Sequence, residues 1–473
     1  MSKAEIFYKD IGDYLSREEK LRIVREGGSI LNPALGMTRL APNEHGDWIH
    51  TRNSNFDDFI PLAPEKKFDK GAQAFFTLYS LGIATNKDAW LYNYSLDKLE
   101  KNVKKMVAFY NGQRIAYHKL PDAKKREAKD CVEYDLSKIT WTDMFLKDIE
   151  DDVAYTVENN KICTSLYRPF TRLQFFNEKQ FIQRTYQQTK LFPENGSENR
   201  LICVSGVGVT KNFSCIITEL LPDLEVIGKS QCFPLYWYEK KNAAQSELFR
   251  DSADAYIRHD AVSDFILDQA KTRYGGKIIK EDIFYYVYGI LHHPEYRRIF
   301  ANDLKKMLPR LPLVEKAADF WAFSKAGRDL ADLHLNYEDQ PPLAEICING
   351  MEIEKWRAET GKRRVESGEW KVHQMKFPAK GQKDTILYNA FLTISNIPPK
   401  AYTYIVNGKS AIEWIMERYA ITTHKESGIQ NNPNDWAEEH NNPQYILDLL
   451  LSVIAVSAQT MDIVVGLPDV QWE

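Results

Sequence analysis

The sequence Ile162-Cys163-Thr164-Ser165-Leu166-Tyr167 (ICTSLY) marks the place where the chain changes from a helical to a strand-like pattern. Its β-branched and aromatic residues favour an extended strand, and similar short runs follow it, separated by Gly, Pro and Asn. We therefore predict a β-rich segment from Asp152 to Glu239. The further strand candidates in this segment are Leu201–Val204, Ser214–Thr218 and Phe233–Tyr238.

The part of the chain before this segment has mainly helical periodicity. Ser16 followed by Glu19 is a capping box, which predicts a helix that continues to about Arg25. Apolar residues recur at helical spacing over Phe68–Gly82 and Leu96–Asn111. We predict that residues 1–150 form a mainly helical region with long connections.

Helical periodicity also returns after the β-rich segment, over Ser246–Thr272. Two consecutive helices are predicted next, Glu281–His292 and a second that begins at Pro294, because proline is tolerated in a helix's first turn. Pro309 ends the second helix. The tyrosines of this pair are interpreted as packing residues rather than as platforms for base stacking. They are Tyr285, Tyr286, Tyr288 and Tyr296.

The last third of the chain predicts a short antiparallel meander followed by helices. Asn407-Gly408 is one of the turn sequences that separate its strands, and Ser410–Tyr419 is helical in pattern. A long final helix is predicted with Asn442 as its cap and Pro443 at its first position, ending at Gly466. The predicted fold class is therefore α+β, a β-rich core flanked by helical regions with a long C-terminal helix. The three meander strands are Trp370–Phe377, Thr385–Ile394 and Ala401–Val406.

The composition places broad limits on function. Hydrophobic residues make up 44% of the 473 residues and charged residues 27%, as in ordinary globular proteins of two or three domains. A formal net charge of -4 disfavours a protein that coats nucleic acid non-specifically, but it allows one positive face for a sequence-specific reader. The six cysteines show no CxxC pair, which fits free thiols in a reducing cytoplasm. The apolar segment Ile446–Val465 contains two aspartates, and we expect it to be too polar to span a membrane.

Three short motifs each match only part of a known ligand-binding or catalytic motif. Ser205–Lys211 (SGVGVTK) resembles half of a phosphate-binding loop, but a strand candidate follows it, so we interpret it as a tight turn. Pro222–Glu225 resembles the acidic cluster of restriction nucleases, with Ile227 where that chemistry needs a lysine. Asn442–Tyr445 (NPQY) approximates the loop with which adenine methyltransferases hold a flipped base, but a helix start explains its Asn and Pro. We predict no catalytic, cofactor-binding or metal-binding residues in this chain.

Two stretches, Lys101–Lys129 and Lys355–Lys383, each hold nine lysines and arginines. In the second stretch the cations alternate with Trp356, Trp370 and Phe377. Such a pattern suits phosphate anchoring combined with base contact, although charge runs are also typical of solvated surfaces.

Eleven segments, taken together and in order, resemble the C-terminal specificity region of type ISP restriction-modification enzymes. In that family one polypeptide carries a nuclease, a helicase-like translocase and an adenine-specific methyltransferase, followed by a target-recognition domain. The segments are Ile11–Lys20, Asn43–Trp48, Tyr79–Trp90, Tyr167–Phe170, Phe233–Tyr236, Asp282–His292, Pro294–Arg297, Leu308–Pro312, Asp332–Glu338, Tyr404–Ser410 and Glu426–Gly428.

The resemblance implies a module that binds double-stranded DNA and positions a methyltransferase and translocase outside this chain. Residues 1–150 would connect to and dock on the methyltransferase, and residues 151–312 and 313–473 would be the two parts of the recognition domain. The parent enzyme would use S-adenosylmethionine, ATP and Mg, and this chain none of them. Because the sequence starts where the family's methyltransferase ends, we expect a split gene product or a fragment.

Two sets of residues are expected to contact DNA, one in the second basic stretch with its meander and one after Tyr167–Phe170. Arg168 itself is interpreted as a structural brace, since an arginine beside proline and aromatic residues often supports the edge of a core. Two other functions remain open, a methyltransferase with divergent motifs and a scaffold that docks a methyltransferase through residues 1–100. The first set is Arg363, Arg364, Lys371, His373, Lys376, Lys380 and Lys383, and the second is Arg172, Lys179 and Arg184.

Overall fold

The computed structural model describes residues 4–12, 15–49, 51–121, 126–241, 255–361 and 367–472, and the chain divides into two units, 1–58 and 59–473. In the first unit β1 (Ile6–Tyr8) pairs antiparallel with β2 (Thr38–Leu40). The capping box at Ser16 is confirmed and opens α1 (Arg17–Gly27), which has no buried residue. The unit also contains the short 3-10 helices η1 (Pro33–Leu35) and η2 (Ser54–Asp58).

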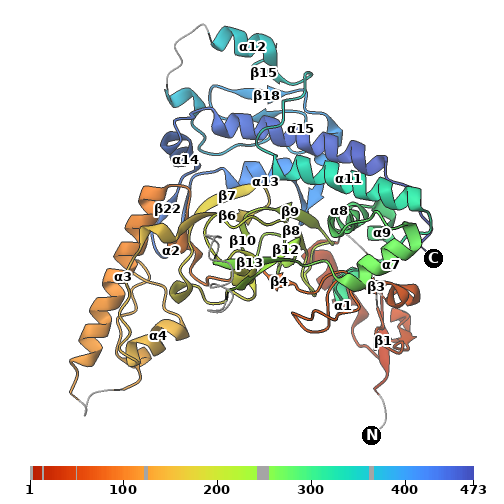
Figure 1. Ribbon diagram of the computed structural model, residues 1–473, viewed down its shortest axis with the longest axis horizontal. Coiled ribbons are helices and arrows are strands. Elements are labelled where there is room, and N and C mark those ends of the chain that lie inside the picture. Colours follow the sequence, from red (N-terminus) through yellow and green to blue (C-terminus); the bar gives the residue numbers. More distant parts are fainter. Residues whose placement is uncertain are drawn as a thin grey trace. The chain divides into compact units, whose positions relative to one another are not determined.

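The predicted β-rich segment forms the centre of the second unit (Figure 1). One four-stranded sheet has the order β10-β6-β7-β5, and a second has the order β4-β11-β8-β9. Strands β8 and β9 are buried along their whole length, which explains their continuous apolar sequences. The strands are β4 (Ser80–Leu81), β5 (Tyr92–Asn93), β6 (Ile162–Arg168), β7 (Thr171–Phe176), β8 (Leu201–Val204), β9 (Cys215–Thr218), β10 (Leu221–Pro222) and β11 (Gln231–Pro234).

Around these sheets one helix prediction is wrong and another is confirmed only in its second half. Phe68–Gly82 is extended rather than helical, with bridges from Phe68 to Leu78 and from Phe76 to Val262. Buried extended chain has apolar residues on both sides, so its pattern can imitate helical spacing. Similarly, the described part of Ser246–Thr272 begins as a strand, β13 (Tyr256–Asp260), which pairs with β12 (Tyr236–Lys240) before α7 (Asp264–Tyr274) begins. Residues 242–254 lie outside the described residues.

The helices of the second unit largely follow the sequence pattern. The predicted helix over Leu96–Asn111 is confirmed and extends to His118 as α3 (Leu96–His118), with Ser95 as its cap. Ile60–Pro61 forms β3 and pairs with β14 (Arg310–Leu311). The other short elements are α2 (Asp88–Leu91), η4 (Ala128–Asp130), α4 (Asp143–Glu150), η5 (Asn159–Lys161), η6 (Lys179–Phe181) and α5 (Gln188–Leu191).

The predicted helix pair is present, although its second helix is interrupted. It consists of α8 (Lys280–Leu291), then α9 (Pro294–Ile299) with His293 as its cap, and then α10 (Asp303–Lys306). Helix α8 packs against α11 (Ala317–Leu335). The four tyrosines of the pair are buried, which confirms their packing role.

The predicted meander is confirmed only in its middle. A small antiparallel sheet has the order β16-β15-β18-β17, but Trp370–Phe377 contributes just the bridge from Lys376 to Leu387. The third predicted strand instead forms a separate hairpin at its end, β19 (Ile405–Val406) with β20 (Lys409–Ser410). The sheet consists of β15 (Cys347–Ile348), β16 (Met351–Glu352), β17 (Ile386–Leu387) and β18 (Thr393–Ser395), and it is accompanied by α12 (Ile353–Thr360) and η7 (Ser367–Trp370).

The chain ends in the predicted long helix, α15 (Tyr445–Val465), which begins two residues after Pro443. By length and composition α15 could cross a membrane, contrary to our expectation, but it is mostly buried and packs against α11, α13 and α14. It is therefore a core helix, and the α+β class is confirmed. The remaining elements are η8 (Pro399–Tyr402), α13 (Ala411–Arg418), β21 (Thr422–Thr423), β22 (Gln430–Asn431) and α14 (Pro433–Glu439).

Candidate nucleic-acid interface

The first predicted set of site residues lies on the segment that precedes β17. Arg363 and Arg364 fall outside the described residues. The other five side chains are all exposed, as contact with a large charged ligand requires. They are Lys371, His373, Lys376, Lys380 and Lys383.

The backbone that carries these side chains is fixed to the rest of the fold. The Asn434 side chain accepts a hydrogen bond from the Val372 N–H at 2.9 Å and donates to the Val372 carbonyl at 2.7 Å. The Ile421 N–H donates to the His373 carbonyl at 3.0 Å, and Lys376 and Leu387 exchange two backbone hydrogen bonds. Exposed cations therefore stand on a positioned backbone, which lowers the conformational entropy lost on binding.

The five side chains differ in how far they are already paired. Lys371 Nζ lies 2.6 Å from Glu438, and Lys383 Nζ lies 2.8 Å from Glu413. Within the described part of the chain, no side chain pairs with His373, Lys376 or Lys380. These three are the most available for an anionic ligand.

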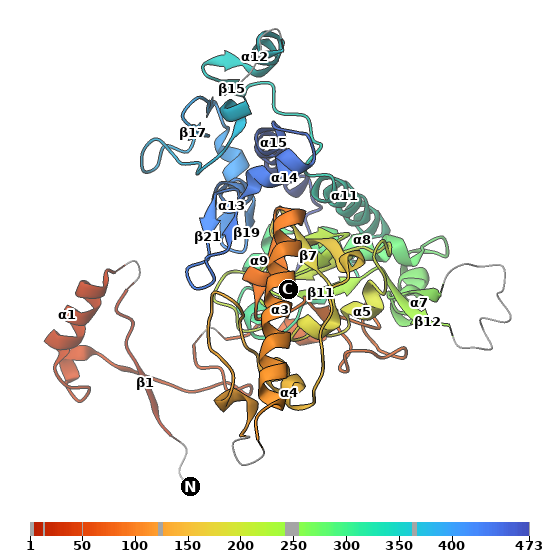
Figure 2. The same ribbon diagram turned by 90° about the vertical axis from the view of Figure 1, so that its left-hand side faces the viewer.

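Helix α13 connects this segment to the β19–β20 hairpin. Glu413 and Glu417 are one helical turn apart and so share one side of α13. Glu413 holds Lys383, and Glu417 holds both Lys409 and Arg418. We call this surface, made of His373, Lys376, Lys380, Lys383, Glu413, Glu417, Lys409 and Arg418, the α13 face. Figure 2 shows β17, α13, β19 and β21 together at one side of the second unit.

The β21–β22 hairpin adjoins the α13 face and was not predicted as a site. Its strand β22 is tied to β5, because the Asn93 side-chain amide donates a hydrogen bond to the Gln430 carbonyl at 3.1 Å. At its tip, His424 Nδ1 lies 2.9 Å from Ser427 Oγ, while Lys425 is exposed. Beneath it lies a pocket of about 470 Å³ that Arg418 helps to line. In the sequence, the only indication of this hairpin was Glu426–Gly428, one of the eleven segments that resemble the type ISP family.

The second predicted set does not lie with the first. Arg172 is engaged inside the fold, with Nε 3.3 Å from Glu338 and the guanidinium 4.9 Å from the centre of the Tyr337 ring. Lys179 and Arg184 are exposed near η6. Arg172 thus has the contacts of a structural residue, whereas the other two remain open to solvent.

Arg168 is a half-buried brace, in line with the prediction that it is structural. Its Nη1 lies 2.7 Å from Asp223 Oδ1, and its guanidinium lies 3.9 Å from the centre of the Tyr167 ring. Burial raises the pKa of Asp223 to about 7, while the charge of Arg168 opposes that rise. Asp223, part of the nuclease-like motif, therefore has a partner within the core.

The first basic stretch is largely neutralised along α3. Lys101 Nζ lies 2.5 Å from Asp97, and Lys104 Nζ lies 3.0 Å from Glu100, each one turn away. Residues 122–125 of this stretch lie outside the described residues. The ion pairs of its described lysines indicate a solvent-exposed helix surface, which charge runs commonly form, rather than a DNA-contact site.

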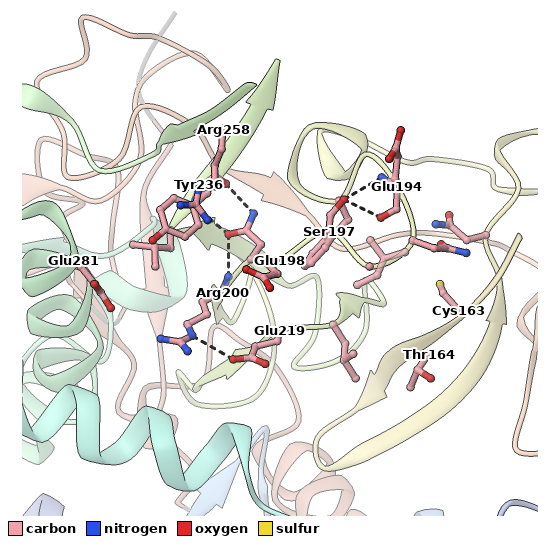
Figure 3. Close-up of a pocket in the computed structure, with 18 residues that line it drawn as sticks. Cys163, Thr164, Glu194, Ser197, Glu198, Arg200, Glu219, Tyr236, Arg258 and Glu281 are labelled. Atoms are coloured by element: carbon pink, nitrogen blue, oxygen red, sulfur yellow. Dashed lines mark hydrogen bonds and ion pairs between the residues drawn. The ribbon is translucent and has the colours of Figure 1, made fainter. Parts of the chain in front are cut away.

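A pocket of about 630 Å³ lies between β6, the segment before β8, and β12 (Figure 3). Arg200 Nε faces Glu219 at 3.2 Å, so this cation is already paired. Acidic residues outnumber basic ones in its lining, which disfavours phosphate. The charged lining residues are Glu194, Glu198, Arg200, Glu219, Arg258 and Glu281.

The methyltransferase-like motif at Asn442–Tyr445 is built into packing. The Tyr445 hydroxyl donates to Glu338 at 3.1 Å and lies 3.5 Å from the Tyr419 hydroxyl. Burial raises the pKa of the Tyr445 hydroxyl well above its ordinary value. This tyrosine is occupied within the fold rather than presented to a base.

Comparison with known proteins adds the context of a family. A model described as the type ISP C-terminal specificity domain matches residues 74–449. Similar solved structures include a nuclease-deletion mutant of the type ISP restriction-modification enzyme LlaGI in complex with a DNA substrate mimic. That structure is 35% identical with a TM-score of 0.82, and the match covers 99% of this chain and 33% of that one.

Two further solved structures resemble the chain. One is the ATP-dependent type ISP enzyme LlaBIII bound to DNA, 33% identical with a TM-score of 0.83, covering 99% of this chain and 28% of that one. The other is the DrdV–DNA complex, which is 27% identical with a TM-score of 0.80. That match covers 98% of this chain and 43% of the DrdV chain. The chain thus spans about a third of the two type ISP chains. No curated protein matches it.

Proposed function

This chain belongs to the type ISP C-terminal specificity domain family, and from that membership we propose that it recognises a short sequence in double-stranded DNA. One observation carries the proposal. Nearly the whole chain matches the corresponding part of enzymes whose structures contain DNA or a DNA mimic. The α13 face supports it, because exposed cations on a fixed backbone suit phosphate contact.

The assignment of roles follows from the chemistry of each side chain. Lys376 and Lys380, exposed and without a side-chain partner among the described residues, bind backbone phosphates. His373 and the β21–β22 hairpin lie next to them and approach the base edges. We keep Lys179 and Arg184 as secondary phosphate contacts and assign Arg172 to the support of the fold.

The proposal extends to the parent enzyme. Methyl transfer to adenine requires the base to leave the duplex, so the methyltransferase must be positioned on one site. We propose that this chain supplies the position, in the cytoplasm of a bacterial cell that restricts phage DNA. S-adenosylmethionine, ATP and Mg would serve the methyltransferase, translocase and nuclease outside this chain.

The test is selection of duplexes from a randomised library by the full chain, followed by titration of the enriched duplex at several salt concentrations. Lys376→Ala and Lys380→Ala should weaken binding to all duplexes alike, and each should lower the slope of log K against log salt by about 0.9. Lys325→Ala is the control, since Lys325 is exposed on α11 and pairs with Asp329. If no duplex is enriched at low salt, the proposal is wrong.

A second proposal concerns residues 1–58, because this unit exposes large apolar side chains that a lone surface helix would normally bury. In α1 the exposed fractions are 51% for Leu21 and 66% for Val24, and Leu31 reaches 85%. We propose that this surface docks on the methyltransferase of the parent enzyme. Leu21→Glu with Val24→Glu should abolish co-purification with that domain, whereas Arg22→Gln should retain it.

A further inference from the structure

Three turns that are far apart in the sequence meet beside the α13 face, and each contains glycine. The first is the loop Ser205–Asn212 between β8 and β9. The second is Gly228–Lys229 before β11, and the third is Asn407–Gly408 between β19 and β20. We call these three turns the glycine platform.

The first two turns are packed so closely that a side chain is excluded where they meet, and the third turn lies against the Lys211 side chain. A Cβ on Gly206 would lie 2.3 Å from the Lys229 carbonyl oxygen, and one on Gly408 would lie 2.9 Å from Lys211 Cδ. The Gly206 N–H donates to the Gly228 carbonyl at 2.9 Å. The glycine platform is therefore a single assembled surface rather than three independent loops.

Two residues of the glycine platform hold a backbone conformation that glycine favours. Lys229 has φ 48° and Asn407 has φ 49°. For lysine this left-handed region costs about 1 kcal/mol or more, and such strained positions cluster at ligand-binding sites. Glycine at position 229 would relieve the strain but would remove the amine.

The side chains that the glycine platform exposes are cations around an apolar tip. Val207 is 42% exposed and stands between two glycines. Lys211 and Lys229 are exposed, and no side chain in the described part of the chain pairs with either. Lys409, next to Gly408, is held by Glu417, which makes the glycine platform continuous with the α13 face.

We propose that the glycine platform is a base-reading part of the DNA interface, an inference that rests on the proposed function. Lys211 and Lys229 bind backbone phosphates on either side of the tip, which fixes the register on the duplex. Val207 enters the major groove and packs its methyl groups against the 5-methyl group of a thymine. The half phosphate-loop pattern of Ser205–Lys211 thus serves a duplex rather than a nucleotide.

The thymine contact is tested with the full chain and the duplex enriched by selection. Each thymine in that duplex is replaced in turn by deoxyuridine, which lacks only the 5-methyl group. At one position the replacement should weaken wild-type binding about fourfold, as expected for one buried methyl group. Val207→Ala should bind the original duplex more weakly and lose its sensitivity at that position alone.

The phosphate contacts are tested by salt dependence. Lys229→Asn removes the charge while keeping a residue that tolerates positive φ, so a loss of binding would not reflect strain. Lys229→Asn and Lys211→Ala should each lower the salt slope by about 0.9 for every duplex, whereas Lys325→Ala should leave it unchanged. Circular dichroism melts establish that each variant is folded.

The outcomes separate the two ideas. If the wild-type chain enriches no duplex, the proposed function and the glycine platform proposal both fail. If the wild-type chain binds a selected duplex but the platform variants keep its affinity, salt slope and deoxyuridine sensitivity, the platform proposal is overturned and the proposed function stands.

Discussion

The backbone N–H of Asn407 donates a hydrogen bond of 2.8 Å to Ser214 Oγ, which joins two segments 193 residues apart in the sequence. Ser214 is 2% exposed and begins the approach to β9, whereas Asn407 forms the turn of the β19–β20 hairpin. One buried hydroxyl thus fixes the hairpin of the C-terminal part onto the central sheet.

Ser214→Ala should therefore destabilise the chain and loosen the glycine platform. Removing the acceptor leaves a partly buried N–H without its partner, at a cost of about 1 kcal/mol in the free energy of unfolding. Urea denaturation measures this cost, and Ser137→Ala is the control because Ser137 bonds only at the surface. Equal losses in the two variants would contradict the role given to Ser214.

The contact between α8 and α11 depends on two glycines. A Cβ on Gly289 of α8 would lie 2.3 Å from the Phe323 carbonyl oxygen, and one on Gly327 of α11 would lie 1.8 Å from the Tyr285 carbonyl oxygen. By contrast, a Cβ on Gly112, at an exposed position of α3, would meet nothing within 4 Å. Gly327→Ala should lower the free energy of unfolding by about 1–3 kcal/mol through overpacking. Gly112→Ala should raise it by about 0.5–1 kcal/mol, because glycine in a helix costs entropy. Thermal and urea unfolding of both variants measure the difference in sign.

The Arg168–Asp223 pair gives a third prediction. Arg168→Met leaves a carboxyl group buried beside Tyr92 without its cation, so a loss of about 3–5 kcal/mol is expected near neutral pH. The double variant Arg168→Met, Asp223→Asn should recover part of that loss, since no buried charge remains. Urea denaturation measures the free energy of unfolding of each variant. If the loss in the double variant equals the sum of the losses in the two single variants, the two side chains do not act as a pair.

Two buried histidines predict acid sensitivity. Burial lowers the pKa of His334 to about 3 and the pKa of His292 well below its ordinary value, and His334 is hydrogen-bonded to Tyr288 and Thr460. The unfolded chain takes up protons on these rings below about pH 6.5, whereas the folded chain does not. Stability should therefore fall as the pH drops below about 6.5, by up to about 1.4 kcal/mol per pH unit for each histidine.

The measurement is the free energy of unfolding between about pH 7 and about pH 4. His334→Gln keeps a side chain that can hydrogen-bond but does not titrate. It should therefore reduce the slope of the free energy of unfolding against pH by the amount that corresponds to about one bound proton. Gly112→Ala, at an exposed position without a titratable side chain, is the control and should keep the wild-type slope. An identical slope in wild type and His334→Gln would show that His334 does not resist protonation in the fold.

Local sequence patterns predicted the secondary structure correctly where a segment's conformation depends mainly on its own residues. The capping box at Ser16, the strand Leu201–Val204 and the helix from Leu96 are present as predicted. Phe68–Gly82 could not be predicted in this way, because its extended form depends on partners such as Val262. Tertiary pairing overrides local periodicity in such segments.

The same distinction applies to the candidate site. Charge and aromatic content led directly to Lys376, Lys380 and Lys383, which are indeed exposed. For Ser205–Lys211 the sequence correctly indicated a turn, but nothing in it shows that Gly228 and Gly408 lie alongside. A site assembled from distant turns is a property of the tertiary fold, and a single sequence does not display it.

Helix α11 packs against α8 on one side and against α15 on the other, and α15 in turn packs against α13. These helices carry the α13 face, and the hydrogen bond from Asn407 to Ser214 joins that face to the central sheet that carries the other turns of the glycine platform. The surfaces proposed to read DNA therefore lie in one unit rather than on separate domains joined by a linker. If a surface turn were exchanged between homologues, we expect the preferred bases to change while the spacing between the contacted positions in the duplex stays constant. We therefore expect a change of specificity in this architecture to alter the preferred bases without altering the length of the recognised sequence.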